Sequence, residues 1–253
     1  MPEIESIEII RADARHFSDF GWLKTRWLFS FASYYDPHNI QFGALRVFND
    51  DVVAPGTGFP THSHEEMEII TIVLDGEMTH QDSMGNQAVI RAGDVQRMSA
   101  GTGLTHSEYN LADRPVHFYQ IWIFPDVPRL EPSYDQRTFS ADAWRNRLLP
   151  VASGQGFDDV VTINTAATIY RGQIDAGSKL NFANTAGRRV FVYLMRGEMR
   201  VDGLTLYKED QARVDTEKPL VLEADSEAEF ILVDVPSCKG WGYSDTILRG
   251  GRK

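Results

Sequence analysis

Four potential metal ligands stand out in this chain as two closely spaced pairs. His62 and His64 form the first pair, and His106 and Glu108 form the second, further along the chain. On a β-strand, residues two apart point to the same face of the sheet. Two such strands facing each other in a barrel would bring three imidazoles and one carboxylate to one point. The spacing therefore predicts a metal site with nitrogen and oxygen ligands.

A second carboxylate competes for the role of oxygen ligand. Glu68 follows His64 by four residues and shares its strand parity. Four residues of extended strand span about 13 Å, which is too far for Glu68 to converge easily with the histidine pair. Glu108 lies two residues from His106, as His64 does from His62, so the spacing favours Glu108. Glu68 is then expected to accept a hydrogen bond from a ligand imidazole.

The elements that position these ligands are short apolar runs. They are rich in Val, Ile, Phe and Tyr and are bounded by Gly, Pro, Asn or Asp, which is typical of β-strands. Their spacing of about ten residues predicts a β-sandwich or a β-barrel. The runs in the first half are Trp27–Ser33, Phe42–Phe48, Glu68–Leu74, Ala88–Ile90, Val95–Ser99 and Val116–Phe124.

The remaining histidines lack a partner at ligand spacing. His80 stands beside the predicted hairpin turn Asp82–Asn86, so we expect it to be solvated. His117 begins a strand and fits either the core or the surroundings of the site. His16 and His38 lie in polar, loop-like segments.

The second half of the sequence repeats the strand pattern of the first. Val73–Met78 and Leu194–Met199 share a Gly-Glu-Met, and an Asp-led segment follows each. A divergent duplication explains this economically, although Gly-Glu turns also recur by chance. Residues 125–147, rich in Pro, Arg and Asp, separate the halves, so we expect domains at 1–130 and 131–253. The second domain contains no histidine.

Composition excludes several classes of protein. The formal net charge of -11 argues against direct nucleic-acid binding and against an anionic membrane surface. No apolar run is long enough to span a membrane, and the N-terminus does not resemble a signal peptide. The single cysteine, Cys238, allows no intramolecular disulfide, which favours a cytoplasmic location.

Glycines flank both ligand pairs, and longer segments complete a recognisable pattern. These segments are Trp27–Pro37, Gly43–Val47, Gln81–Asn86, Ser99–Glu108 and Tyr119–Trp122. Together they resemble the pirin family of the cupin superfamily, and most closely the bacterial pirins with quercetin 2,3-dioxygenase activity. The resemblance implies an all-β bicupin, in which two antiparallel, jelly-roll-like β-barrels pack together with a few short helices.

The resemblance also implies a ligand set. Pirins hold one metal in the N-terminal barrel on three histidines and one glutamate, and the matching positions are His62, His64, His106 and Glu108. The C-terminal domain would then be a degenerate cupin without metal ligands. The chain departs from the wider cupin pattern at Ser99, where a proline is usual.

The expected cofactor is one divalent transition metal ion per chain. Iron is the first expectation, with Mn, Ni, Cu, Zn or Co as alternatives, because affinity alone does not determine occupancy. The resemblance implies a flavonol substrate such as quercetin, cleaved with O2, with Glu108 as the catalytic base. Phe59 and Met98 are expected to line an aromatic pocket.

A non-enzymatic role is the alternative hypothesis. Eukaryotic pirins resemble transcriptional cofactors that act through protein partners, so the chain could be a metal- or redox-sensing regulatory module. An isomerase or a sugar-binding cupin also stays open, because the barrel hosts many chemistries. The sequence lacks a Gly-x-Ser-x-Gly elbow, a phosphate loop and a dinucleotide fingerprint.

Overall fold

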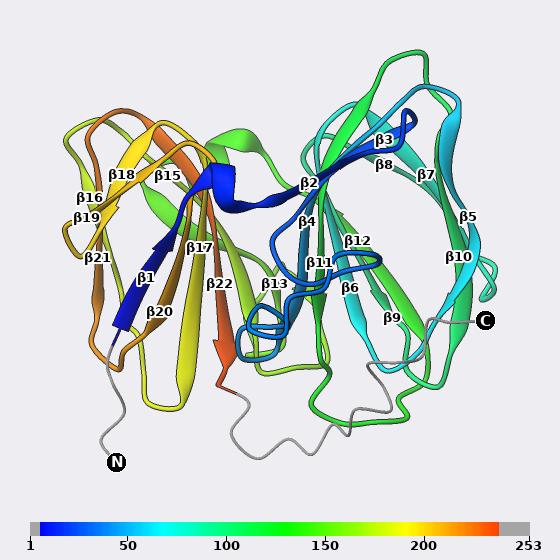
Figure 1. The fold of residues 1–253 in the computed structure, drawn as a ribbon. Coiled ribbons are helices and arrows are strands. Elements are labelled where there is room, and N and C mark those ends of the chain that lie inside the picture. Colours follow the sequence, from blue (N-terminus) through cyan, green and yellow to red (C-terminus); the bar gives the residue numbers. More distant parts are fainter. Residues whose placement is uncertain (1–5, 238–253) are drawn as a thin grey trace.

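The computed structural model describes residues 6–237 as two β-barrels (Figure 1). Within that range the only helices are two short 3-10 turns, η1 (Ala12–Ala14) and η2 (Ala141–Trp144). The all-β bicupin prediction is confirmed. Neither helical turn in the described range has the length or hydropathy to cross a membrane. Cys238 lies outside the described residues.

The first barrel consists of a seven-stranded sheet and a four-stranded sheet. In spatial order, the larger sheet contains β12 (Ser133–Thr138), β9 (Asp94–Ser99), β6 (Glu68–Asp75), β11 (Val116–Ile123), β4 (Leu45–Val53), β3 (Leu23–Trp27) and β2 (His16–Asp19). The smaller sheet contains β5 (Thr57–His64), β10 (Leu104–Asn110), β7 (Glu77–Asp82) and β8 (Gln87–Arg91). All neighbours in both sheets are antiparallel.

The second barrel repeats this strand order, except that the last pair at one edge of its larger sheet is parallel. Its larger sheet contains β1 (Ser6–Ile10), β20 (Gln211–Asp215), β17 (Arg188–Arg196), β22 (Ala228–Pro236), β15 (Thr168–Ile174), β13 (Arg147–Ser153) and β14 (Val161–Thr162). Its smaller sheet contains β16 (Lys179–Phe182), β21 (Leu220–Ala224), β18 (Glu198–Val201) and β19 (Leu204–Tyr207). In the shared Gly-Glu-Met, the glycine has a positive φ in both barrels, and the glutamate begins β7 in one barrel and β18 in the other. The common strand order therefore agrees with a duplication.

The two barrels exchange an edge strand. β1 begins the described chain, yet it pairs with β20 of the second barrel. β12 leads into the second barrel along the chain, yet it pairs with β9 of the first. Sheet membership therefore does not change at residue 130, and the division into 1–130 and 131–253 stays a prediction.

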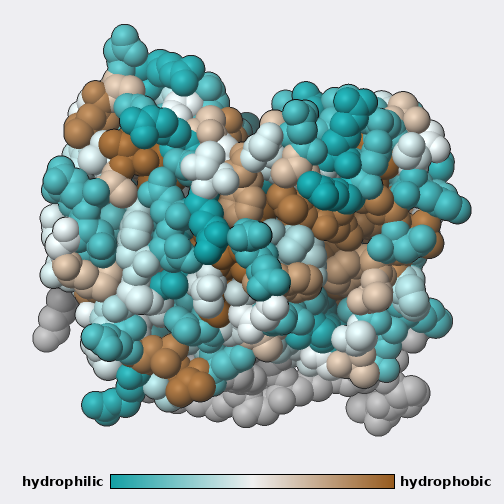
Figure 2. All heavy atoms as spheres, turned by 180° about the vertical axis from the view of Figure 1, so that it is seen from behind, coloured by the Kyte–Doolittle hydropathy of each residue, from teal (hydrophilic) through white to brown (hydrophobic). Residues whose placement is uncertain are grey.

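The seven-stranded sheets pack against each other and bury the largest apolar cluster between the barrels. Phe48 on β4 shows the contact: its ring centroid lies 5.3 Å from that of Phe191 and 5.0 Å from that of Tyr193, both on β17. The four-stranded sheets lie on the two outer sides (Figure 1). From behind, the surface is largely hydrophilic, with an apolar area on the half built from the second barrel (Figure 2).

Candidate metal centre

The register of two strands positions the predicted ligands. β5 and β10 are hydrogen-bonded neighbours in one sheet, not opposite walls of the barrel, and His106 lies directly across from His62. An irregularity in pairing follows His106, so Glu108 lies across from Phe59. On its other side β10 pairs with β7, which places Glu108 across from His80. The period of two along both strands turns these side chains to one face.

Three imidazoles converge at the end of this strand pair. The Nε2 atoms of His62 and His106 lie 3.1 Å apart. One ring nitrogen from each of His62, His64 and His106 lies within 4.8 Å of the others. Two nitrogen ligands that are each about 2.1 Å from one ion lie about 3.0–3.4 Å apart at tetrahedral or octahedral angles. The His62–His106 separation fits two ligands of a single ion.

Burial keeps two of these imidazoles neutral. Burial, and then the charge of nearby His62, lowers the pKa of His64 to about 4. Burial, and then the charges of His62, His64 and His80, lowers the pKa of His106 to about 2. At pH 7 both rings therefore carry a free lone pair, and protons compete little with a metal ion.

Glu108 lies deeper in the barrel and is 1% exposed. Its Oε2 accepts a hydrogen bond of 2.9 Å from Gln120 Nε2, while its Oε1 has no partner among the described residues. A carboxylate oxygen of Glu108 groups with His106 and His80, within 4.8 Å, instead of with His62 and His64. Burial raises the pKa of Glu108 above its ordinary value. The assignment of Glu108 as a ligand therefore stays a prediction.

His80 is not solvated, so the expectation for this residue is wrong. Its side chain is fully buried, its ring centroid lies 5.4 Å from that of His106, and its Nε2 lies 3.1 Å from Asp82 Oδ2. The alternation along β7 could have indicated this burial, since Met78, His80 and Asp82 lie on the same face of the strand. The adjacent turn led to the opposite expectation, because turns usually lie in solvent.

Glu68 does not accept a hydrogen bond from an imidazole, so that expectation is also wrong. Its side chain faces the other barrel, where Oε2 accepts from the backbone N–H of Asn164 at 3.0 Å. Its Oε1 accepts from Ser99 Oγ at 2.5 Å. Glu68 alternates with the residues of β6 that face the barrel interior, and this parity turns it away from the ligands.

Polar side chains continue inward from the ligands. One row crosses four neighbouring strands of the large sheet, because each member lies across from the next: Asn49, Gln120, Thr71 and Gln96. Asp51 lies on the same face of β4, where burial, and then the charges of Asp50 and Glu108, raises its pKa to about 8. The interior of the first barrel is thus polar beneath the ligand cluster.

Aromatic side chains bound the cluster. Trp122 makes an edge contact with His64, with 4.9 Å between ring centroids. Met98 belongs to the apolar cluster against which Trp122 packs. Phe59 belongs to a different cluster, where it contacts Trp22. The predicted aromatic pocket lining is therefore divided between two places, and Trp122 is the ring beside the imidazoles.

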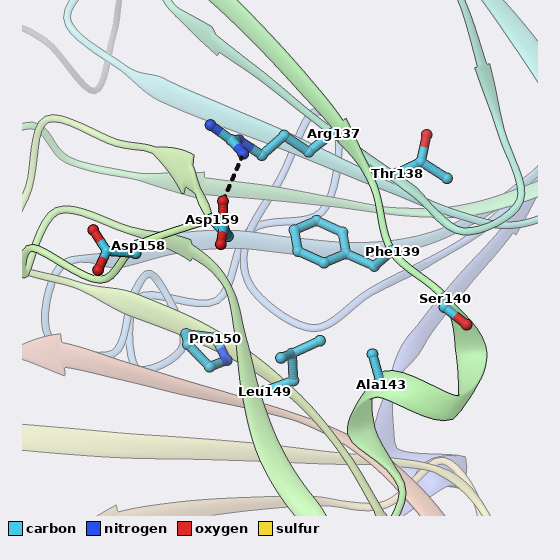
Figure 3. A pocket seen from close by; sticks show the side chains of 9 residues that line it. All are labelled: Arg137, Thr138, Phe139, Ser140, Ala143, Leu149, Pro150, Asp158 and Asp159. Carbon is cyan, nitrogen blue, oxygen red and sulfur yellow. Dashed lines mark ion pairs between the residues drawn. The ribbon is translucent and has the colours of Figure 1, made fainter.

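A separate cavity of about 480 Å³ lies along β12, η2 and β13 (Figure 3). Arg137 and Asp159 form an ion pair of 3.7 Å across it. Its lining residues are Arg137, Thr138, Phe139, Ser140, Ala143, Leu149, Pro150, Asp158 and Asp159. None of the predicted ligands lines this cavity, so it is not the space in which the imidazoles converge.

The second barrel is filled with apolar side chains at the equivalent place. β16 and β21 correspond in sheet order to β5 and β10. Phe182, Leu220 and Leu222 from these strands belong to one buried cluster. The same architecture therefore carries a ligand cluster in one half and a packed core in the other, which defines a bicupin with a single candidate centre among the described residues.

Comparisons with known proteins identify the family. The model of the family described as Pirin matches residues 10–123, and that of the quercetinase C-terminal cupin domain matches residues 150–235. A pirin-like protein of Caulobacter vibrioides is 43% identical over 218 residues, covering 86% of this chain and 94% of that protein. The chain belongs to the pirin family.

Further relatives carry more specific names. A protein of Escherichia coli K12 named quercetin 2,3-dioxygenase is 40% identical over 231 residues, covering 91% of this chain and 99% of the relative. The crystal structure of the bacterial pirin YhhW from E. coli in complex with nickel(II) has a TM-score of 0.87 and 38% identity, covering 91% of this chain and 99% of that chain.

Proposed function

We propose that this protein is a metal-dependent pirin that cleaves flavonols such as quercetin with O2. The observation that carries the proposal is the convergence of the ring nitrogens of His62, His64 and His106. The name of the E. coli relative, quercetin 2,3-dioxygenase, supports the choice of substrate class.

Residues of the first barrel would hold one divalent transition metal ion. We assign His62, His64, His106 and Glu108 as its ligands and iron as the ion. Nickel is the first alternative, because the E. coli pirin structure is a complex with nickel(II). Nitrogen and oxygen donors suit either metal. When bound, the ion supplies Lewis-acid and redox chemistry.

Glu108 would act as the general base toward the flavonol 3-hydroxyl group. Gln120 donates to its Oε2, so Oε1 would be the oxygen that accepts the hydroxyl proton when Glu108 is partly released from the metal. A positioned general base contributes about 10²–10⁴-fold to rate.

Trp122 would orient the planar substrate and exclude water. Its indole Nε1–H lies 3.3 Å from Gln120 Oε1, so the same amide side chain contacts both Trp122 and Glu108. The T-shaped contact with His64 places the apolar ring of Trp122 next to the ligands. Flavonol rings are aromatic and pack favourably against such a surface.

Metal content and flavonol turnover, measured on the same preparation, test the proposal. We expect about one metal ion per chain by plasma mass spectrometry, and oxygen-dependent loss of the visible absorbance of quercetin after loading with Fe(II) or Ni(II). His106→Ala should lose both. His38→Ala, which changes an exposed histidine outside the cluster, should retain both.

Two results would overturn the proposal. Protein that binds no metal under any reconstitution would refute the ligand assignment. Metal-loaded protein that leaves flavonols intact in the presence of O2 would refute the enzymatic role and favour the regulatory alternative. The cytoplasmic location, the lack of nucleic-acid binding and the possible protein partner stay predictions from the sequence.

A further inference from the structure

The loop between β3 and β4, residues 28–44, contains most of the segment Trp27–Pro37, which supplies none of the predicted ligands. Within it, Phe31 and Tyr34 form a tight turn, because each backbone N–H donates to the carbonyl oxygen of the other, at 3.0 and 2.9 Å. Ala32 in this turn has a φ of 47°, in the left-handed region that residues with a side chain rarely adopt. Such strain persists where surrounding contacts fix the backbone, so the loop has a defined conformation.

The turn brings the ring of Phe31 to the metal centre. Phe31 meets Trp122 almost at a right angle, with 5.3 Å between ring centroids and 82° between the planes. Trp122 is the ring that contacts His64. Phe31 and Trp122 are both partly exposed, whereas Trp27, which also contacts Phe31, is buried. Two accessible rings therefore form an aromatic corner beside the imidazoles.

Contacts within the first barrel hold both sides of the loop. The backbone N–H of Ser30 donates to the carbonyl oxygen of Asn39 at 2.7 Å. Arg46 on β4 donates through Nη1 to the carbonyl oxygens of Ser30 and Ile40, at 2.8 and 3.0 Å. These bonds join the two limbs of the loop on either side of the turn that carries Phe31.

Arg213, on β20 of the second barrel, holds the same loop from the other side of the barrel contact. Its Nη2 donates to the carbonyl oxygen of Leu28 at 3.1 Å and to Oδ1 of Asn39 at 2.7 Å. Its guanidinium carbon lies 4.5 Å from the centre of the Phe29 ring. Arg213 is buried, and hydrogen bonds from a charged donor are strong where water is excluded. A side chain of the second barrel thus fixes a loop that reaches the centre in the first.

We propose that Phe31 contacts the substrate, so that Phe31 and Trp122 together hold the planar flavonol, and that Arg213 is the positioning residue for Phe31. This inference rests on the proposed function, because it takes the flavonol as the substrate of the metal centre. Rings at a right angle allow an aromatic ligand to stack on one ring and to meet the other edge to face. The second barrel, which has no ligand cluster among its described residues, thereby shapes the site of the first.

Flavonol binding to Ni(II)-loaded protein without oxygen tests the substrate contact independently of turnover. Phe31→Ala removes the ring, and Phe31→Tyr retains it. Phe157→Ala is the matched control, because Phe157 is an exposed phenylalanine that contacts Tyr170 in the second barrel instead. The readouts are the dissociation constant of quercetin, from the change in its visible absorbance, and the Tm of each variant.

The positioning role of Arg213 has a matched control of its own. Arg213→Met removes the hydrogen bonds to the loop and keeps an unbranched side chain. Arg171→Met alters another buried arginine of the second barrel, which lies over the ring of Trp144 and donates to Glu229. Both variants should lower the Tm, but only Arg213→Met should weaken flavonol binding. In turnover assays Arg213→Met should raise KM with little change in kcat, a split that a loss of stability alone does not produce.

The expected results separate the variants. Phe31→Ala should raise the dissociation constant of quercetin about 10-fold, and Arg213→Met should raise it about 2–10-fold, because the loop must then be ordered on binding. Phe31→Tyr and both controls should stay close to the wild type. An unchanged dissociation constant in Phe31→Ala would overturn the substrate contact, and equal constants in Arg213→Met and Arg171→Met would overturn the positioning role.

A measurement on the unaltered protein keeps the inference testable if Phe31→Ala fails to fold. In Zn(II)-loaded protein labelled with ¹³C in the phenylalanine rings, intermolecular nuclear Overhauser effects report which rings touch quercetin, and Phe31→Tyr identifies the Phe31 signals. We expect contacts to Phe31, and bound quercetin without them would overturn the inference alone. Wild-type protein that binds metal but no flavonol would instead refute the proposed function, and this inference with it.

Discussion

Asp51 provides a test of the polar interior of the first barrel. The folded protein raises the pKa of this buried carboxyl group to about 8, whereas the ordinary value in an unfolded chain is about 3.9. Each unit of difference corresponds to about 1.4 kcal/mol. Four units set an upper limit of about 5–6 kcal/mol on the effect of ionising Asp51 in the fold.

The sign of the pH dependence follows from proton binding. Between about pH 4 and pH 8 the folded protein holds a proton on Asp51 and the unfolded chain does not, so stability falls as the pH rises. The contribution of Asp51 is complete below the unfolded pKa and is lost as the pH approaches 8. Asp51→Asn is neutral at every pH and removes this dependence.

Urea unfolding of chelator-treated protein between pH 5 and pH 7.5 measures the effect. The difference in unfolding free energy between Asp51→Asn and the wild type should change by about 3 kcal/mol in favour of the variant as the pH rises from 5 to 7.5. Asp75→Asn, at an exposed carboxylate, is the matched control and should show a constant difference from the wild type. An Asp51→Asn difference that is also constant would show that Asp51 is ionised in the fold, and would refute the reasoning.

Three further predictions concern the candidate centre and the contact between barrels. Glu108→Gln should lower kcat for flavonol loss about 10²–10⁴-fold, measured at known metal content. Removal of the metal by a chelator should lower the free energy of unfolding by about 2.7 kcal/mol, if the free metal concentration was one hundred times its Kd. A lower Tm would report this loss. Glu68→Ala should cost about 2–3 kcal/mol, because Ser99 and Asn164 lose a charged partner, while exposed Glu65→Ala should cost little. An unchanged kcat in Glu108→Gln would contradict the role of Glu108 as base. An unchanged Tm after chelation would contradict metal binding by the folded protein. Equal losses of stability in Glu68→Ala and Glu65→Ala would contradict the account of Glu68.

Strand parity explains how much of the centre the sequence could predict. The spacing in His62–His64 and His106–Glu108 placed each pair on one face, because side chains alternate along any strand. Parity alone does not say which face is buried or which strand lies alongside. His80 obeys the same alternation, but its position beside His106 depends on the pairing of β7 with β10, which joins residues far apart in sequence.

The partner of Glu68 was beyond local reasoning for a similar reason. Its carboxylate is bound by Asn164, a residue of the other half, across the contact between the seven-stranded sheets. The exchange of β1 and β12 is likewise invisible in the strand pattern, since an edge strand has the same alternation whichever sheet it joins.

The sequence by itself determined that the chain is all-β, that its two halves share a strand pattern, and that histidine occurs in only one of them. These properties follow from local alternation, from turn residues, and from the absence of histidine in residues 131–253. The tertiary structure decided which groups meet: His62 with His106, His80 with Asp82, and Glu68 with the opposite barrel. Those contacts depend on register and on the packing of two sheets, which are set by the whole chain and not by any one segment of it.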